Sequence, residues 1–499
     1  MLCVRGYGIP VKNKSLSKGG IYYLVYNVLN MAFPFITGIY VAKKLFPDSI
    51  GEVAAAQNLA QYFVILAFLG IPTYGMREIA KTGGDREERS KVFSELYVIN
   101  FVSTCICLLC YLVLVFSVQT YRNGLILYLI VGISVALNVF NISWLYEGLE
   151  EFQFISLRNA VFKVLSFLLL VLFVRKPEDY LIYAGITVIG TAGNYIVNMV
   201  FAPKFVRISF HSLRLKRHLK SVLYLVAVNL AIELYSLVDV TMMNLMSSKE
   251  SIAFYKYGHS IHLMLLQVIN TFTMVLIPRI AYYFKEDRKE ELNRLVSKAF
   301  KLILICAVPM IVGIQFTADF LIVQMYGEVY INSAAILRML SILLLVSPIG
   351  YLLGSRMLLA ANHEDRMIIS VGTGAVVNMI GNAILIPKYA EFGAAAASII
   401  SEFVVMIIYV NLGRKYFRLE GVKQTGINVV ISALLMGIFL CVCGELPLNG
   451  WLVLFTQTAG AAALYIACLL LLKEEIVRQY SGMAVRKLKH LSRGWQNNE

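Results

Sequence analysis

Charged residues are scarce in this sequence. Asp, Glu, Lys and Arg make up only 15% of its 499 residues, while 59% are hydrophobic. Soluble domains carry about 25% charged residues, so a water-soluble chain of this composition could not cover its surface, and most of that surface must face lipid. The net charge of +15 does not indicate nucleic-acid binding, because the basic residues lie in short connectors between apolar runs.

Motifs for ATP hydrolysis, metal binding and covalent catalysis are missing as well. The sequence has no Gly-Lys dipeptide and therefore no GxxxxGK[ST] loop, and it has no HExxH, GxSxG or DxD pattern. Cys107 and Cys110 form a CxxC pattern, but they lie with Cys105 inside one apolar run and are interpreted as apolar helix residues. We therefore expect a protein that is not an enzyme and holds no metal or cofactor.

Long apolar runs are what the sequence has instead. A helix needs about 20 residues to cross the hydrocarbon core of a bilayer. Continuous runs exclude a closed barrel, whose strands would alternate. The predicted fold is an all-α polytopic membrane protein with about 14 transmembrane helices, at 19–42, 51–76, 94–118, 123–146, 157–174, 180–202, 221–246, 252–278, 299–323, 332–359, 367–387, 391–413, 426–446 and 450–472.

The distribution of basic residues supports this number of spans. Counted from a cytoplasmic N-terminus, roughly 36 Lys and Arg residues fall on the inner side and about 7 on the outer side. Arg158 and Lys163 are counted here as residues of an inner connector. Omitting one helix would scramble the alternation, so we expect both termini in the cytoplasm.

The chain repeats itself at an offset of about 200–210 residues. Ile71-Pro72 is matched by Ile277-Pro278, and Pro177 is matched by Pro387. Six helices per half, each half starting on the inner side, would form parallel repeats. The predicted organisation is a basic N-terminus (1–18), an N-lobe of six helices (19–203), a basic linker (204–220), a C-lobe of six helices (221–413), a two-helix appendage (414–472) and a basic cytoplasmic tail (473–499).

Polar residues inside the apolar runs are the candidates for function, because burying them in lipid is costly. In the run 252–278, Lys256, His259, Gln267 and Asn270 fall on one helical face at 100° per residue. Such a stripe either satisfies a neighbouring helix or lines a water-filled lumen. We predict that it lines a lumen.

Other runs add polar groups to the predicted lumen. Arg338 lies about two turns from the outer end of its run, where it either faces the lumen or pairs with an acidic neighbour. Asp239 and Glu233 lie on different faces of one run, and either could bind a coupling proton or sodium ion. Pro34 is expected to bend the first helix. The remaining predicted lumen residues are Asn27, Asn30, Gln57 and Gln61, together with Glu233.

These side chains favour one class of substrate. Amides suit a sugar, which offers many hydrogen-bond donors and acceptors, and cations suit a phosphate, whose attraction to them grows away from bulk water. The combination fits an amphiphile with an anionic, glycosylated head group.

Several stretches are characteristic in their order and spacing. They are "VAKKLFPDSIGEVAAAQNLAQYF" and "GIPTYGMREIAK", then "WLYEGLEEFQFISLRNAVFKVLSF", then "IPRIAYYF", and then the segment Leu352–Glu402. Together they resemble the polysaccharide (O-antigen and capsule type) flippases of the multidrug/oligosaccharidyl-lipid/polysaccharide exporter superfamily. The resemblance covers about residues 15–415.

The resemblance implies two six-helix lobes around a central cavity that opens alternately to each side. It implies a substrate, an oligosaccharide linked through diphosphate to undecaprenol, that is moved across a prokaryotic plasma membrane for surface polysaccharide assembly. The implied partners are membrane lipid and, beyond it, a polysaccharide polymerase and glycosyltransferases, with no nucleic acid. Coupling to a proton or sodium gradient would supply the energy.

Two other functions remain open from the sequence. A drug/cation antiporter of the same superfamily would use Glu233 or Asp239 for its coupling ion. A membrane glycan polymerase or ligase is less favoured, because the outer connectors are too short for an extended domain that holds a sugar acceptor.

Overall fold

The chain is helical throughout the part that the structure describes. The structure is a computed structural model, and it describes residues 30, 32–210, 213–274, 276–361, 363–444, 451–479 and 481. No strand occurs within these ranges. The prediction of an all-α fold is therefore confirmed for them.

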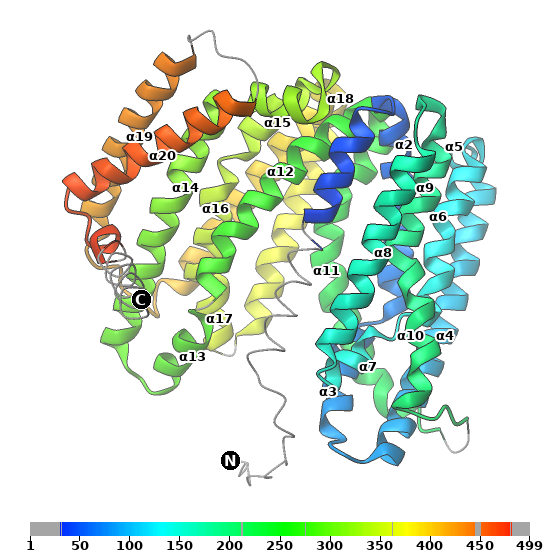
Figure 1. The fold of residues 1–499 in the computed structure, drawn as a ribbon. Coiled ribbons are helices and arrows are strands. Elements are labelled where there is room, and N and C mark those ends of the chain that lie inside the picture. The colour runs from blue at the N-terminus through cyan, green and yellow to red at the C-terminus, as the bar shows by residue number, and fades with distance from the viewer. Residues whose placement is uncertain are drawn as a thin grey trace, which may run out of the picture. The chain divides into compact units, whose positions relative to one another are not determined.

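The chain divides into two compact units, Met1–Ala253 and Phe254–Glu499. The sequence-based boundary lay earlier, at the linker 204–220; here α11 is grouped with the first unit because it packs against α2. The first unit begins with the helix Ala32–Ala42. Its other helices, labelled in Figure 1, are α2 (Pro47–Phe68), α3 (Ile71–Lys81), α4 (Arg86–Ser117), α5 (Gln119–Asn123), α6 (Leu125–Leu137), α7 (Ser143–Gly148), α8 (Phe152–Phe173), α9 (Tyr180–Val188), α10 (Asn194–Phe201) and α11 (Lys216–Met246).

The second unit is built around the long helix α14 (Lys289–Tyr326). The two C-terminal helices α19 and α20 pack against α14 and against each other (Figure 1). The unit boundary falls inside α12 (Lys249–Met274). The other helices of this unit are α13 (Ile277–Lys285), α15 (Asn332–Leu340), α16 (Leu343–Gly350), α17 (Arg356–Ala360), α18 (Glu364–Gly413), α19 (Val422–Gly444) and α20 (Trp451–Leu471).

Among the described residues, each of the predicted transmembrane runs contains a helical segment. Within the described ranges, nine helical stretches are long and apolar enough to cross a membrane, and three shorter apolar helices accompany them. One of the nine, Asp365–Gly413, has 49 residues, which is the length of two spans. It is interrupted at Ala390, where φ is 49° and ψ is −124°, three residues after Pro387. The chain is thus a polytopic membrane protein, and the number fourteen stays a prediction.

The second predicted run ends earlier than the hydropathy suggests. Leu69 and Gly70 both have left-handed backbone angles, with φ of 50° and 72°, so α2 stops at Phe68. Pro72 then starts the short helix α3, since proline is tolerated at the first turn of a helix. The matching Ile277-Pro278 starts α13 in the same way. Both Ile-Pro pairs therefore mark a break between a long helix and a short amphipathic one.

The extended segment that follows α10 is fixed to the start of α4. The side chains of Ser90 and Ser94, one turn apart on α4, accept hydrogen bonds from the backbone N–H groups of Arg207 and Ser209 at 2.9 and 3.0 Å. Alternate residues of an extended chain point their N–H groups the same way, which matches the i, i+4 spacing of the serines.

The second unit contains the same arrangement. On α14, the side chains of Asn293 and Ser297 accept hydrogen bonds from the backbone N–H groups of Arg418 and Glu420, both at 2.8 Å. The helix residues are again four apart and the extended residues two apart. This recurrence is what a parallel repeat of two halves predicts.

Glu95 strengthens the attachment in the first unit. Its side chain is fully buried and accepts hydrogen bonds from the backbone N–H of Arg214 and the Nε of Arg217, each at 2.8 Å. It also lies 2.8 Å from the Nε2 of His218, whose Nδ1 faces the hydroxyl of Tyr74 at 2.9 Å. These five residues, named the Glu95 clasp below, fix the start of α11 to α3 and α4.

Two of the characteristic sequence stretches pack against each other through glycines. A Cβ atom at Gly75 on α3 would lie 2.6 Å from the ring of Trp144 on α7, and one at Gly148 would lie 2.8 Å from the carbonyl oxygen of Met76. Trp144 is 1% exposed and stacks on Phe93 of α4. The small residues are therefore needed for the close approach of α3 and α7.

Replacing Gly75 with leucine is expected to destabilise the first unit by about 1–3 kcal/mol, because the added side chain overpacks the Trp144 site. Thermal unfolding of the purified protein in detergent checks this. Gly83→Leu is a poor control because Gly83 has a positive φ, so Gly84→Leu, where nothing lies within 4 Å of an added Cβ, serves instead. Equal unfolding temperatures for Gly75→Leu and wild type would contradict the packing argument.

Candidate functional site

Two basic residues lie buried inside a predicted membrane-spanning helix of the first unit. Arg158 and Lys163 belong to α8, which runs over 22 residues from Phe152 to Phe173, and each is 8% exposed. Their interpretation as residues of a cytoplasmic connector is corrected by this placement. Lys163 lies about 16 Å along the helix from Phe152, which is close to its middle.

The environment of these cations is aromatic and amide-rich. The Nζ of Lys163 lies 5.1 Å from the centroid of the Phe33 ring, and the Asn159 side chain donates a 2.8 Å hydrogen bond to Asn30. The guanidinium carbon of Arg158 lies 5.6 Å from the Phe154 ring, and the charge of Glu147 acts on Arg158. Of the predicted lumen residues, Asn30 is thus bound by Asn159, which lies between the two cations in the sequence. The residues Asn30, Phe33, Arg158, Asn159 and Lys163 are together named the α8 cluster below.

The two predicted glutamines of α2 have different surroundings. Gln57 donates a 2.8 Å hydrogen bond to Thr187 of α9, while Gln61 is exposed. Between them, Asn58 donates to the hydroxyl of Thr241 on α11 at 2.7 Å. Gln57 therefore helps to satisfy a neighbouring helix, and Gln61 keeps its polar group on the surface of the unit.

Asp239 lies buried near this group of polar side chains. It is 7% exposed, and its charge acts on Tyr62, whose hydroxyl lies 2.8 Å from that of Thr241. Pro34 is exposed and lies near the start of the helix Ala32–Ala42. The bend expected at this proline stays a prediction. Asn27 and the side chain of Glu233 lie outside the described residues.

The predicted stripe on α12 is partly accessible. Lys256, His259 and Asn270 are half-buried, and Gln267 is exposed. The His259 ring stacks on Tyr255 with 5.2 Å between ring centroids. Tyr255 in turn lies 3.3 Å, hydroxyl to hydroxyl, from Ser398 of α18. The stripe is therefore a continuous edge of α12 that combines a cation, an imidazole and two amides.

Arg338 pairs with an acidic neighbour. Its guanidinium lies 2.6 Å from the carboxylate of Asp319 on α14 and donates to the backbone carbonyl of Gln315. The side chains of Arg338 and Asp319 are 31% and 54% exposed, so the pair is open on one side. This is one of the two alternatives that the sequence left open, and it lowers the net charge that Arg338 can offer to a phosphate.

Glu402, a further intramembrane charge, accepts a 2.7 Å hydrogen bond from Ser347 of α16. The charges of Glu402 and Arg356 both act on Tyr351 and Tyr409, so these four side chains lie near one another in the second unit. The second unit thus has a polar group of its own, with both signs of charge.

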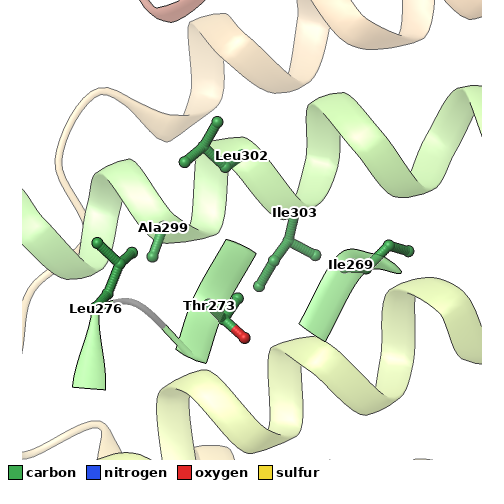
Figure 2. Close-up of a pocket in the computed structure, with 6 residues that line it drawn as sticks. All are labelled: Ile269, Thr273, Leu276, Ala299, Leu302 and Ile303. Atoms are coloured by element: carbon green, nitrogen blue, oxygen red, sulfur yellow. The ribbon is translucent and has the colours of Figure 1, made fainter. Parts of the chain in front are cut away.

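A small apolar pocket lies between the end of α12 and α14 (Figure 2). Its one polar lining residue, Thr273, donates its hydroxyl to the carbonyl of Asn270 at 2.9 Å. The pocket therefore has little to offer a sugar or a phosphate. It is lined by Ile269, Thr273, Leu276, Ala299, Leu302 and Ile303.

Comparison with known families decides the relationship of the chain. The family model described as polysaccharide biosynthesis protein matches residues 16–284 of the 499. The chain belongs to this polysaccharide biosynthesis family. A protein of Escherichia coli (strain K12) named "Putative O-antigen transporter" is 22% identical over 418 residues, which are 80% of this chain and 97% of that protein. The resemblance found in the sequence is confirmed.

Solved structures show which fold this polysaccharide biosynthesis family member has. "Lipid II flippase MurJ, inward closed conformation" matches with a TM-score of 0.69 at 15% identity, covering 93% of this chain and 99% of that one. An inward-facing multidrug resistance MATE family transporter of the MOP superfamily matches with a TM-score of 0.62 at 16% identity, covering 82% and 96%. The chain therefore shares the fold of these two proteins.

Sequence reasoning missed Arg158, Lys163 and His262 as candidate site residues. For Lys163, an available signal was the helical pattern itself, because Asn159, Lys163 and Ser166 recur at i, i+4 and i+7 within an apolar stretch. His262 lies one turn after His259 on α12 and is 3% exposed. It was overlooked because it lies away from the centre of the polar stripe.

Proposed function

We propose that this chain is a flippase that moves a lipid-linked oligosaccharide, carried on undecaprenyl diphosphate, across the bacterial plasma membrane for surface polysaccharide assembly. The observation that carries the proposal is the α8 cluster, in which two cations are buried inside an intramembrane helix beside an amide pair. Buried intramembrane charges are costly and mark substrate or ion pathways.

The chemistry of the α8 cluster suits such a head group. Lys163 and Arg158 offer positive charge to a diphosphate in surroundings where water competes weakly. The Asn30 and Asn159 amides offer donors and acceptors to sugar hydroxyls. The prenyl tail needs no polar contact and stays in lipid while the protein alternates between inward-open and outward-open states.

The proposal includes a topology and partners. Fourteen spans with both termini in the cytoplasm would present the basic linker and tail to the inner leaflet, as the distribution of Lys and Arg favours. The division into an N-lobe, a C-lobe and a two-helix appendage follows from the repeat. Glycosyltransferases that build the oligosaccharide and a polymerase that extends it are the expected partners, because the chain itself lacks motifs for either reaction.

A drug/cation antiporter is the second candidate function, and Asp239 is the observation that favours it. A 7% exposed carboxylate near the hydroxyls of Tyr62 and Thr241 and the amide of Asn58 could exchange a proton or sodium ion. The two functions differ in a simple phenotype. Removing the protein should abolish surface polysaccharide if it is a flippase and should only raise drug sensitivity if it is an antiporter.

Replacing Lys256 and Arg338 together with alanine is expected to stop export of surface glycan while the protein remains inserted in the membrane. The single Arg338→Ala change should reduce glycan export less than the single Lys256→Ala change, because Asp319 already pairs with Arg338. Surface glycan is measured by lectin or antibody staining, with Lys388→Ala as a control at an exposed position. Normal surface glycan in the double variant would remove both residues from the transport path.

A further inference from the structure

Two histidines lie one turn apart on α12, inside the predicted membrane span. The rings of His259 and His262 are stacked with 6.0 Å between centroids and 27° between planes. Tyr255 stacks on the other side of His259, with 17° between planes, so three rings form a column along one edge of the helix. His259 is half-buried, whereas His262 is 3% exposed. Within the column, the partly accessible His259 ring thus stacks on the enclosed His262 ring.

Burial of the His262 side chain costs free energy. Its Nδ1 atom is buried and has no hydrogen-bond partner. A phenylalanine would fill similar space without burying an unsatisfied polar atom. Helix packing alone therefore does not explain an imidazole at this position. A role in binding and releasing a proton would explain it.

Metal binding is an unsuitable alternative. Within the described ranges, no group of three or more His, Cys, Asp or Glu side chains could hold a metal ion. Two imidazoles alone fall short of the three or four protein ligands that zinc and similar ions take.

Protonation would disrupt the column. A charge on His262 would be cut off from water and would face a second imidazole across the stack, and on the same helix Lys256 already carries a positive charge. The helices α14, α15 and α18 contact α12. Among the described residues of these helices, Asp319 and Arg338 pair with each other, Glu402 accepts a hydrogen bond from Ser347, and Glu391 accepts one from Asn332. The second imidazole, His259, is the titratable group that stacks on His262.

We infer that the His259–His262 pair is a proton-binding site whose occupancy selects between two conformations of the second unit. The closed column described here is the unprotonated state. Proton uptake at the pair favours a state in which the rings separate and the inner imidazole reaches water. Two conformations that differ by one bound proton change their ratio by up to about tenfold per pH unit.

This inference rests on the proposed flippase function for its purpose, since a proton gradient across the membrane would then drive the change of state. The site itself can be tested without the substrate. Histidine is the suitable residue for such a switch because its ordinary pKa lies near physiological pH.

Hydrogen exchange of the full-length protein in lipid nanodiscs, between about pH 5.5 and 7.5, tests the site. The exchange rates are first corrected for their intrinsic pH dependence. The equilibrium constant for opening of α12 in wild type should then increase as the pH falls, by up to about tenfold per pH unit for each proton bound. His262→Gln should lose this dependence, and His259→Gln should reduce it. His363→Gln, which alters a histidine at the start of α18 instead, should retain it.

The outcomes separate the two proposals. A pH dependence of α12 opening that is the same in His262→Gln and wild type overturns the proton site, whatever the transport result. A pH dependence that is lost in His262→Gln but kept in His363→Gln supports the site, even if the protein exports no glycan. If wild-type glycan export also varies with external pH and the His262→Gln variant has lost that variation, the proton site belongs to the transport cycle.

Discussion

Replacing Lys163 with methionine is expected to reduce glycan export by about ten- to a hundredfold, because a charge-assisted contact to a phosphate is worth about 1.5–3 kcal/mol. Methionine keeps the length of the side chain and its packing on Phe33 but removes the charge. The expected signature is accumulation of lipid-linked oligosaccharide in the cells, measured by extraction and mass spectrometry, with a normal amount of inserted protein.

Two further variants make the Lys163 test specific. Lys163→Arg keeps the charge and should retain part of the export, although the guanidinium is larger and differently hydrated. Lys176→Met, at an exposed position after α8, should export normally. Unchanged export by Lys163→Met, with protein present at the wild-type amount, would show that the α8 cluster has no part in handling the substrate.

Replacing Glu95 with alanine should destabilise the first unit by about 2–4 kcal/mol. Removing one partner of a buried ion pair leaves the other groups uncompensated, and here these are the N–H of Arg214, the imidazole of His218 and part of the Arg217 guanidinium. The estimate lies at the lower end of the usual range because the Arg217 side chain is 44% exposed and can be hydrated. Thermal unfolding and protease cleavage between 205 and 218 measure the effect.

The similar attachment in the second unit supplies a matched comparison for the Glu95 clasp. Ser297→Ala removes one backbone attachment of the second unit, at which no buried ion pair is involved, and should cost only about 0.5–1.5 kcal/mol. Glu95→Gln keeps the shape of the side chain but loses its charge. Its loss of stability should lie between those of Ser297→Ala and Glu95→Ala. A Glu95→Ala variant as stable as wild type, and as resistant to protease, would show that the clasp adds nothing to the attachment of the linker.

Much of the helical fold could be predicted from the sequence because lipid imposes a strong length rule on apolar runs. The Ile-Pro pairs and Pro177 also marked breaks, since proline removes a helical hydrogen bond and here starts new helical segments. Pro387 lies inside α18, three residues before its interruption at Ala390. The stop at Leu69 was not predictable from hydropathy, because it depends on left-handed backbone angles at two positions and not on polarity.

The candidate site was predicted less completely. The stripe on α12 followed from helical periodicity, but Arg158 and Lys163 were assigned to a connector, because basic residues near the start of an apolar run usually mark its cytoplasmic end. Whether a charge lies inside a span depends on where the helix begins, and α8 begins at Phe152. Glu95 and His218 join helices that are distant in sequence, so one sequence alone gave no signal for this pair. For Arg338 the sequence left two alternatives open, and the partner Asp319 became known only from the structure.

The central claim is that this protein itself moves a lipid-linked oligosaccharide between leaflets. Purified full-length protein in unilamellar vesicles, with an undecaprenyl-diphosphate oligosaccharide present in both leaflets, tests it through the fraction that an added membrane-impermeant glycosidase can digest. We expect digestion to proceed past the outer-leaflet half towards completion with wild-type protein, and the part beyond one half to be digested about ten- to a hundredfold more slowly with Lys163→Met. Digestion that halts at the same fraction in wild-type and protein-free vesicles, both with and without an imposed proton or sodium gradient, would contradict it.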